Sequence, residues 1–212
     1  MAQIVTGIRS VLSNPRVYNL VQNLFGARKA RRLIVSSYFP AHDHYRMLDI
    51  GCGTAEILEF LPETVEYYGF DASEDYIRQA RQRFGHRGVF RAELVRNATL
   101  GDMPPFDLIL AFGLLHHLDD DEATGLFELA ASHLHPEGCL LTVDPVFCTG
   151  QGPVARWIIG KDRGQNIRRR DSYAGLAANH FEKIEAIERH DLLHIPYSHC
   201  ILRCQKPIVR SP

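Results

Sequence analysis

The chain has 212 residues, 45% of them hydrophobic and 23% charged, with a formal net charge of −1. This balance is ordinary for a globular protein and gives no overall field that would favour nucleic acid or an anionic membrane. The sequence has no apolar run of membrane-spanning length and no continuous apolar segment near its start, so we expect a cytoplasmic protein without membrane association.

In chain order, the sequence predicts a helical leader, an alternating core and a C-terminal part. The leader, residues 1–44, is expected to form two helical pieces broken near Gly26. Apolar runs of strand length then alternate with segments of helical spacing. The predicted strands are 45–50, 65–70, 88–94, 106–112, 139–147, 183–193 and 198–204, and the predicted helices are 54–61, 73–84, 120–134 and 172–181.

Alternating strands and helices require right-handed crossover connections. The sequence therefore predicts an α/β fold, a doubly wound Rossmann-like sheet that is mostly parallel and has helices on both faces. No linker or repeat divides the chain, so we expect one domain over residues 1–212. It comprises the leader (1–44), a ligand-binding core (45–145) and a part with a substrate loop, a helix and two strands (146–212).

A glycine turn follows the first predicted strand, in the stretch MLDIGCGTAE over residues 47–56. Gly51 and Gly53 let the backbone approach a ligand closely, and a helix start beside them offers unpaired N–H groups. Asp71 ends the second predicted strand 20 residues after Gly51 and is suited to accept hydrogen bonds from ribose hydroxyls. Asp49, just before the glycines, would repel a pyrophosphate, so a ligand with cationic groups fits better than a dinucleotide.

These residues resemble the class I S-adenosylmethionine-dependent methyltransferases. The glycine motif of that family is matched by Asp49, Gly51, Cys52, Gly53 and Thr54, with Ala55 where a third glycine is usual. The resemblance implies that Asp71 binds the ribose and that Glu93 receives the adenine amino group, with Ala72 and Leu94 beside them as further cofactor-binding residues. It covers about residues 45–145 and implies S-adenosylmethionine as cofactor and about seven strands, the last antiparallel.

The leader also resembles the N-terminal helices of small bacterial members of this family. Tyr18 and Gln22 stand four residues apart and would share one face of a helix. The resemblance implies that the leader folds over the cofactor, with Tyr18 near the adenosyl group. The alternative is that Tyr18 only packs the helix onto the domain.

The stretch FGLLHHL after the fourth predicted strand resembles the loop that lies beside the transferred methyl in this family. An imidazole titrates near neutral pH, so His116 is a candidate general base. Its neighbour His117 is a candidate for contact with the acceptor or for capping the next helix. The alternative is that both histidines are structural, since many methyl transfers need no base.

A basic stretch follows the fifth predicted strand, where loops of this fold lean over the substrate. We expect Arg163 and Arg168 to grip an anionic group of the acceptor, because a guanidinium pairs two oxygens at once. Solvated loop charge is the alternative.

No metal site is expected. The five cysteines contain no CxxC pair, and Cys200 and Cys204 are expected to be core residues. The pairs His133/His135 and His190/His194 have no carboxylate cluster in register. The acidic run 119–122 is explained by the helix that it starts.

The sequence thus predicts a methyltransferase acting on an oxygen or nitrogen of a small molecule. Nucleic acid is not expected as substrate, because the loop FGLLHH lacks the Pro-Pro-aromatic element of amino-directed DNA methyltransferases. A nicotinamide-dependent oxidoreductase and a non-catalytic binding protein are the two alternatives. The sequence gives no indication of the oligomeric state.

Overall fold

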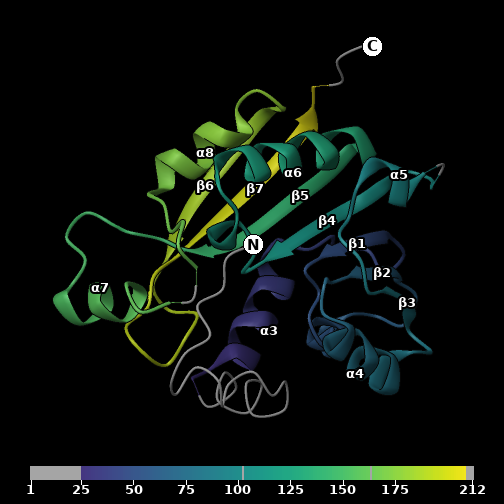
Figure 1. The fold of residues 1–212 in the computed structure, drawn as a ribbon, viewed down its shortest axis with the longest axis horizontal. Coiled ribbons are helices and arrows are strands. Elements are labelled where there is room, and N and C mark those ends of the chain that lie inside the picture. The colour runs from purple at the N-terminus through teal and green to yellow at the C-terminus, as the bar shows by residue number, and fades with distance from the viewer. Residues whose placement is uncertain (1–24, 102, 163, 209–212) are drawn as a thin grey trace.

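The computed structural model describes residues 25–101, 103–162 and 164–208, which form a sheet with helices around it (Figure 1). The strands are β1 (Arg46–Ile50), β2 (Glu66–Phe70), β3 (Gly88–Arg91), β4 (Phe106–Phe112), β5 (Leu134–Pro145), β6 (Phe181–Arg189) and β7 (His199–Pro207). The helices are α3 (Ala27–Tyr38), α4 (Glu74–Phe84), α5 (Asn97–Leu100), α6 (Asp120–His133), α7 (Pro153–Ile159) and α8 (Arg170–Ala177), and two 3-10 helices are η1 (Glu56–Phe60) and η2 (Leu115–His117).

The seven strands lie in the order β3-β2-β1-β4-β5-β7-β6. Strands β1 to β5 pair in parallel, and β7 is antiparallel to both of its neighbours, β5 and β6. This confirms the predicted mostly parallel sheet with an antiparallel last strand. The chain reverses its winding direction between β1 and β4, and open sheets of this kind bind ligands beyond the carboxyl ends of the strands at that point.

Helices cover both faces of the sheet, as predicted (Figure 1). On one face, α6 buries Ala123, Phe127 and Ala130 in a core cluster that α8 completes. On the other face, α3, η1 and α4 share a second cluster, to which α4 contributes Ile77 and Ala80. The buried positions are three or four residues apart, because an amphipathic helix presents one apolar stripe to the sheet.

The starts of α4 and α6 follow from local sequence. Ser73 caps α4 by accepting a hydrogen bond from the backbone N–H of Tyr76 at 3.3 Å. Asp119 caps α6, and Glu122 returns a hydrogen bond to the Asp119 backbone, which completes a capping box. The acidic run 119–122 is therefore the start of a helix, as predicted. None of the described helices combines the length and apolar character needed to cross a bilayer.

Several local predictions of secondary structure were wrong. The strand predicted over 88–94 ends at Arg91, the strand predicted over 183–193 spans Phe181–Arg189, and the helix predicted over 172–181 spans Arg170–Ala177. The segment 54–61 forms the short 3-10 helix η1, which starts after Ala55 in a left-handed conformation, rather than an α-helix. Strand β5 begins at Leu134, earlier than predicted, and its register with β4 shifts before it becomes regular. Gly138 permits this irregular approach, because a Cβ there would lie 2.9 Å from the carbonyl oxygen of Phe106. The short helices α5 and α7 were not predicted.

Candidate active site

The turn between β1 and η1 has the backbone conformation that its glycines predict. Gly51, Gly53 and Ala55 have φ values of 76°, 55° and 56°, a region that glycine enters without strain. The backbone N–H groups of Gly51 and Cys52 donate to the carbonyl oxygen of Phe70, at 2.8 and 3.0 Å. A Cβ added to Gly53 would meet no heavy atom within 4 Å, so this part of the turn faces open space.

Asp71 lies directly after β2 and joins this turn to the next helix. Its Oδ2 accepts a hydrogen bond from the backbone N–H of Gly53 at 3.0 Å, and its Oδ1 accepts one from Ser73 at 2.8 Å. Burial raises the pKa of Asp71, although both hydrogen bonds favour the carboxylate. Each oxygen keeps a second lone pair, which a ribose hydroxyl can use.

Asp49 is buried at the end of β1, with 3% of its surface exposed. The hydroxyl of Tyr67 donates to its Oδ2 at 2.6 Å. Burial raises the pKa of Asp49 to about 7, and the hydrogen bond from Tyr67 opposes this shift. A cation bound nearby would favour the charged carboxylate. Asp49 therefore has the chemistry to favour a positively charged ligand at this turn.

The side chain of Cys52 turns back toward the sheet. A Cβ added to Gly69 of β2 would lie 2.9 Å from the Cys52 sulfur, so only glycine at position 69 leaves room for the thiol. Cys52 can then contact a ligand through its backbone, while its sulfur packs on β2.

Glu93 and Leu94 follow β3, and both are exposed. Glu93 lies 3.7 Å from Arg91 in an ion pair. The backbone N–H of Asp71 donates to the carbonyl oxygen of Arg91 at 3.2 Å, which brings the end of β3 beside Asp71 and Ala72. The structure therefore brings these predicted adenine and ribose residues to one edge of the sheet.

His116 lies in η2 after β4 and is held between two carboxylates. Its Nδ1 is 2.8 Å from Asp144 Oδ1 at the end of β5, and its Nε2 is 3.2 Å from Asp162 Oδ1. Burial alone would lower the pKa of His116, but hydrogen bonds to both carboxylates outweigh it and raise the pKa to about 9. Near neutral pH the side chain is therefore an imidazolium that donates to both partners.

Further side chains complete this buried polar cluster. The hydroxyl of Tyr197 donates to Asp162 Oδ2 at 2.6 Å, and the ring of Tyr197 lies 5.0 Å from that of His199. Burial lowers the pKa of His199 to about 4, so this side chain is neutral. Asp144 Oδ2 and His199 Nδ1 are buried without a hydrogen-bond partner among the described residues. Such atoms are costly to leave unpaired, and an acceptor or a water molecule can satisfy them.

Four members of this cluster were not predicted from the sequence: Asp144, Asp162, Tyr197 and His199. Asp144 follows an apolar run and shows the same signal as Asp49, an acid at the end of a strand. Asp162, Tyr197 and His199 lie in loops or in a late strand, where no local pattern marks them. His117, by contrast, stacks beside His116 with ring centroids 4.1 Å apart and is only partly buried.

Arg168 differs from its predicted role as an anion-binding residue. All five of its N–H donors are used: they bond the carbonyl oxygens of Leu115, Asn166 and Leu118 and the carboxylate of Asp120. The side chain is 10% exposed. In this arrangement Arg168 fastens its loop to η2 and α6, and no donor remains for an acceptor. Arg163 and Tyr18, also predicted site residues, lie outside the described residues.

The loop that carries Asp162 lies directly on His116. A Cβ added to Gly164 would be 2.0 Å from His116 Cδ2, and the backbone N–H of Asn166 donates to the carbonyl oxygen of His116 at 3.0 Å. The loop therefore covers the end of β4 through close backbone contact that only glycine at position 164 permits.

Helix α3 lies in the described part of the leader and packs against η1, which follows the glycine turn. Arg31 pairs with the buried Glu56 of η1 at 2.8 Å. The backbone N–H of His194 donates to the carbonyl oxygen of Phe25 at 2.9 Å, next to Gly26, whose φ is 100°. Helix α3 therefore starts directly after Gly26, and the first helical piece predicted for the leader lies outside the described residues.

A hollow of about 240 Å³ lies at the opposite edge of the sheet. It is lined by His44, Tyr45, Arg46, Thr64, Glu66 and Asp107. It contains none of the residues of the glycine turn or the polar cluster, and its volume is below the range of about 300–1,000 Å³ that is typical of small-molecule sites.

Comparisons with known proteins agree with this geometry. A family model described as a methyltransferase domain matches residues 48–140, which include the glycine turn, Asp71 and His116. A search of curated proteins by sequence gives no significant match.

Solved structures show the same fold. The plantazolicin methyltransferase BpumL aligns with 93% of this chain and 94% of its own, at a TM-score of 0.67 and 14% identity. The N-methyltransferase NodS from Bradyrhizobium japonicum, solved with S-adenosyl-L-homocysteine, aligns with 86% of each chain at a TM-score of 0.59 and 17% identity. The S-adenosylmethionine-dependent methyltransferase SibL aligns with 84% of this chain at a TM-score of 0.65 and 15% identity. The alignment covers only 55% of the SibL chain.

These comparisons support S-adenosylmethionine as the cofactor and give no support to the nicotinamide-dependent alternative. The described residues fit that cofactor, because an open glycine turn, a buried acid and a second acid lie together at the carboxyl edge of β1 and β2. The chain therefore contains a region that matches a methyltransferase domain over residues 48–140, and it shares its seven-stranded fold with S-adenosylmethionine-dependent methyltransferases.

Proposed function

We propose that the protein transfers a methyl group from S-adenosylmethionine to an oxygen or nitrogen of a small organic molecule. The observation that carries the proposal is the hydrogen bond between Gly53 and Asp71, which builds one ligand-binding turn from the ends of β1 and β2. Two of the similar structures are the N-methyltransferase NodS and the mitomycin 7-O-methyltransferase MmcR, and this supports a small acceptor.

Each part of the turn has a proposed partner on the cofactor. The backbone of Gly51 and Gly53 holds the methionine end, and Asp49 favours its cationic groups. Asp71 accepts hydrogen bonds from the ribose. Glu93 accepts one from the adenine amino group.

Bound S-adenosylmethionine supplies an electrophilic methyl group on a sulfonium. The protein holds the acceptor in line with that methyl, and such positioning is worth about 7–11 kcal/mol at best. Excluding water from the site would favour methyl transfer from a cationic donor. The loop over His116 is suited to exclude water, since it is closely packed on η2.

For His116 we propose a positioning role in place of the general base that the sequence suggests. As an imidazolium near neutral pH it has no lone pair for a proton, and it holds Asp162 and its loop in place. The cluster of Asp144, Asp162 and His116 has a net negative charge. It therefore suits an acceptor that donates a hydrogen bond and keeps a free lone pair for the methyl group, such as a neutral amine or a hydroxyl compound.

A screen with methyl-labelled S-adenosylmethionine tests the proposal. Amines, alcohols, phenols and carboxylic acids are incubated with the protein, and mass spectrometry locates the label. We expect labelling of an amine or a hydroxyl compound, and none with the Asp71→Ala variant. Cofactor binding without labelling of any acceptor would support the non-catalytic binding protein instead.

A cytoplasmic location and the absence of a nucleic-acid partner are part of the same proposal. All five cysteines are free, which suits a reducing compartment. The net charge of −1 offers no basic surface of the extent that a polyanion requires.

A further inference from the structure

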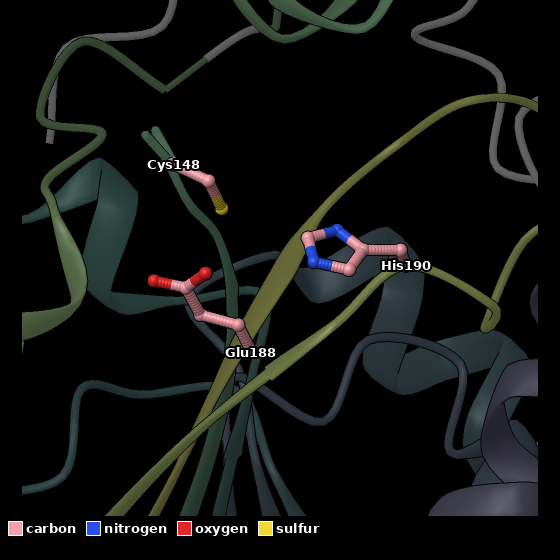
Figure 2. A group of neighbouring side chains, drawn as sticks. All are labelled: Cys148, Glu188 and His190. Carbon is pink, nitrogen blue, oxygen red and sulfur yellow. The ribbon is translucent and has the colours of Figure 1, made fainter. Parts of the chain in front are cut away.

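Three side chains with metal-binding atoms lie together at the carboxyl edge of the sheet, away from the glycine turn (Figure 2). The sulfur of Cys148, a carboxylate oxygen of Glu188 and a ring nitrogen of His190 all lie within 4.8 Å of one another. Within residues 25–101, 103–162 and 164–208, no other group of three such residues has this geometry. Cys148 is buried, Glu188 is half-buried and His190 is exposed, so a metal could reach them from solvent.

The fold explains why these residues meet. Glu188 lies near the end of β6 and His190 just beyond it, two residues apart, so both side chains point to the same side of the strand. Strand β7 lies between β5 and β6, and Glu188 pairs with Cys200, which in turn pairs with Asp144 of β5. Cys148 follows the last residue of β5 by three positions, and its thiol lies beside the end of β6.

A second layer of hydrogen bonds orients the histidine. His190 Nδ1 lies 2.9 Å from the hydroxyl oxygen of Ser198, which also accepts a hydrogen bond from Gln151 Nε2 at 3.1 Å. Figure 2 shows the opposite edge of the ring facing Cys148 and Glu188, which leaves Nε2 as the ligand atom. Histidines that bind metals commonly donate their other ring N–H to such a partner.

We propose that Cys148, Glu188 and His190 bind a divalent metal ion of the zinc class. Thiolate, imidazole and carboxylate are the three side-chain ligands that Zn²⁺ uses, and three protein ligands leave a fourth position open to water or another small ligand. Tetrahedral zinc with usual bond lengths separates its ligand atoms by about 3.5 Å. The three ligand atoms therefore need to approach one another by about 1 Å, which rotation of their side chains would allow.

The bound ion would fasten the segment after β5 to the end of β6. This segment continues into the loop of Asp162, which covers His116, so the metal would restrain the acceptor side of the protein. The site lies at the β6 end of the sheet, about 19 Å or four strand spacings from β1. Its occupation does not depend on methyl transfer.

Titration of the metal-free protein with Co²⁺ tests this inference. We expect one equivalent per chain, with the near-ultraviolet band of a cobalt–thiolate bond, and displacement by Zn²⁺. Cys148→Ser should remove the band, and His190→Ala and Glu188→Gln should each weaken Zn²⁺ binding at least 100-fold. Ser198→Ala, which removes the hydrogen bond to His190, should weaken it about 10–100-fold.

Two variants serve as matched controls. Cys139→Ser removes another buried cysteine, and Glu185→Gln removes an exposed acid on the same strand β6. Both should bind Zn²⁺ as the parent does. Because His190 is exposed, His190→Ala tests the site even if Cys148→Ser fails to fold. A parent protein without the cobalt–thiolate band, or a band that persists in folded Cys148→Ser, would overturn the proposal, as would parental affinity in His190→Ala.

Discussion

The backbone N–H of Gly53 donates a hydrogen bond to Asp71 Oδ2 at 3.0 Å, and the other oxygen of that carboxylate accepts one from Ser73 at 2.8 Å. One side chain thereby joins the turn after β1 to the start of α4. Neighbouring parallel strands bring both turns to the same edge, and Asp71 fixes how they sit together. The shape of the glycine turn therefore depends on the residue that we expect to bind the ribose.

Asp49 predicts a pH dependence of cofactor binding. Burial raises its pKa to about 7, so below that pH the free protein carries a protonated Asp49. A cationic cofactor favours the carboxylate, and binding must then release a proton. The dissociation constant for S-adenosylmethionine should rise as pH falls below about 7, approaching tenfold per pH unit. Calorimetry at several pH values measures this.

The Asp49→Asn variant is the control for that pH dependence. It should bind the cofactor more weakly at pH 8, since the charge is lost, and its dissociation constant should vary little with pH. If the variant kept the pH profile of the parent, Asp49 would not be the titrating group.

His116 predicts a pH dependence of stability. Its pKa is 6.5 in an ordinary environment and about 9 in the folded protein, so protonation stabilises the fold. This contribution is fully present below pH 6.5 and is lost as pH rises through about 9, with a size of about 3 kcal/mol. Urea unfolding of His116→Gln should lack this decrease between pH 6.5 and 9, whereas His117→Gln should show it. An equal decrease in His116→Gln and parent would contradict the assignment.

Gly164 should tolerate no side chain. In Gly164→Ala the new Cβ would lie 2.0 Å from His116 Cδ2, so the loop must move away from η2. Overpacking of this kind costs about 1–3 kcal/mol. We expect a higher KM for the acceptor and an unchanged dissociation constant for S-adenosylmethionine. Gly152→Ala is the matched control in the same segment, because a Cβ there meets no atom within 4 Å. Equal kinetics for both variants would refute this role of the loop.

Arg168 should contribute to stability rather than to acceptor binding. Its removal takes the side-chain donor from the carbonyl oxygen of Leu118 and one of two donors from that of Leu115, which should lower the free energy of unfolding by about 1–3 kcal/mol. Arg168→Lys should not restore it, because one ammonium group cannot serve all these acceptors. Denaturant unfolding measures the loss, with exposed Arg169→Ala as control. Normal stability together with a raised KM for the acceptor would indicate instead that Arg168 binds an anionic group of the acceptor.

The order of strands and helices and the glycine turn could be predicted because their signals are local. The glycine turn is short and contains Gly51 and Gly53, and an acid stands near the end of β1 and directly after β2. The alternation of apolar runs with helical segments predicts the strands of the sheet. The helix predicted over 54–61 was wrong because its apolar residues pack in a short 3-10 helix after Ala55, and periodicity alone does not distinguish the two.

The contacts of His116, Asp162 and Arg168 could not be predicted from such local patterns. His116 and Asp162 are 46 residues apart in the chain, and only the folded loop brings them together. Arg168 likewise lies in a basic stretch of the sequence, which suggested a free guanidinium. The sequence does not show which backbone carbonyl oxygens a side chain will bond in the folded protein. Long-range hydrogen bonds of this kind depend on the tertiary fold.

Calorimetric titration of S-adenosylmethionine into the parent, Asp71→Ala and Asp75→Ala proteins tests whether the cofactor binds on the glycine turn. We predict one site per chain in the parent, at least tenfold weaker binding in Asp71→Ala, and parental binding in Asp75→Ala, whose carboxylate is exposed on α4. The magnitude follows from about 1.5–3 kcal/mol for each hydrogen bond to a charged group. Unfolding curves without cofactor establish that Asp71→Ala is folded. A folded Asp71→Ala protein that binds S-adenosylmethionine as tightly as the parent would contradict the placement of the cofactor on this turn.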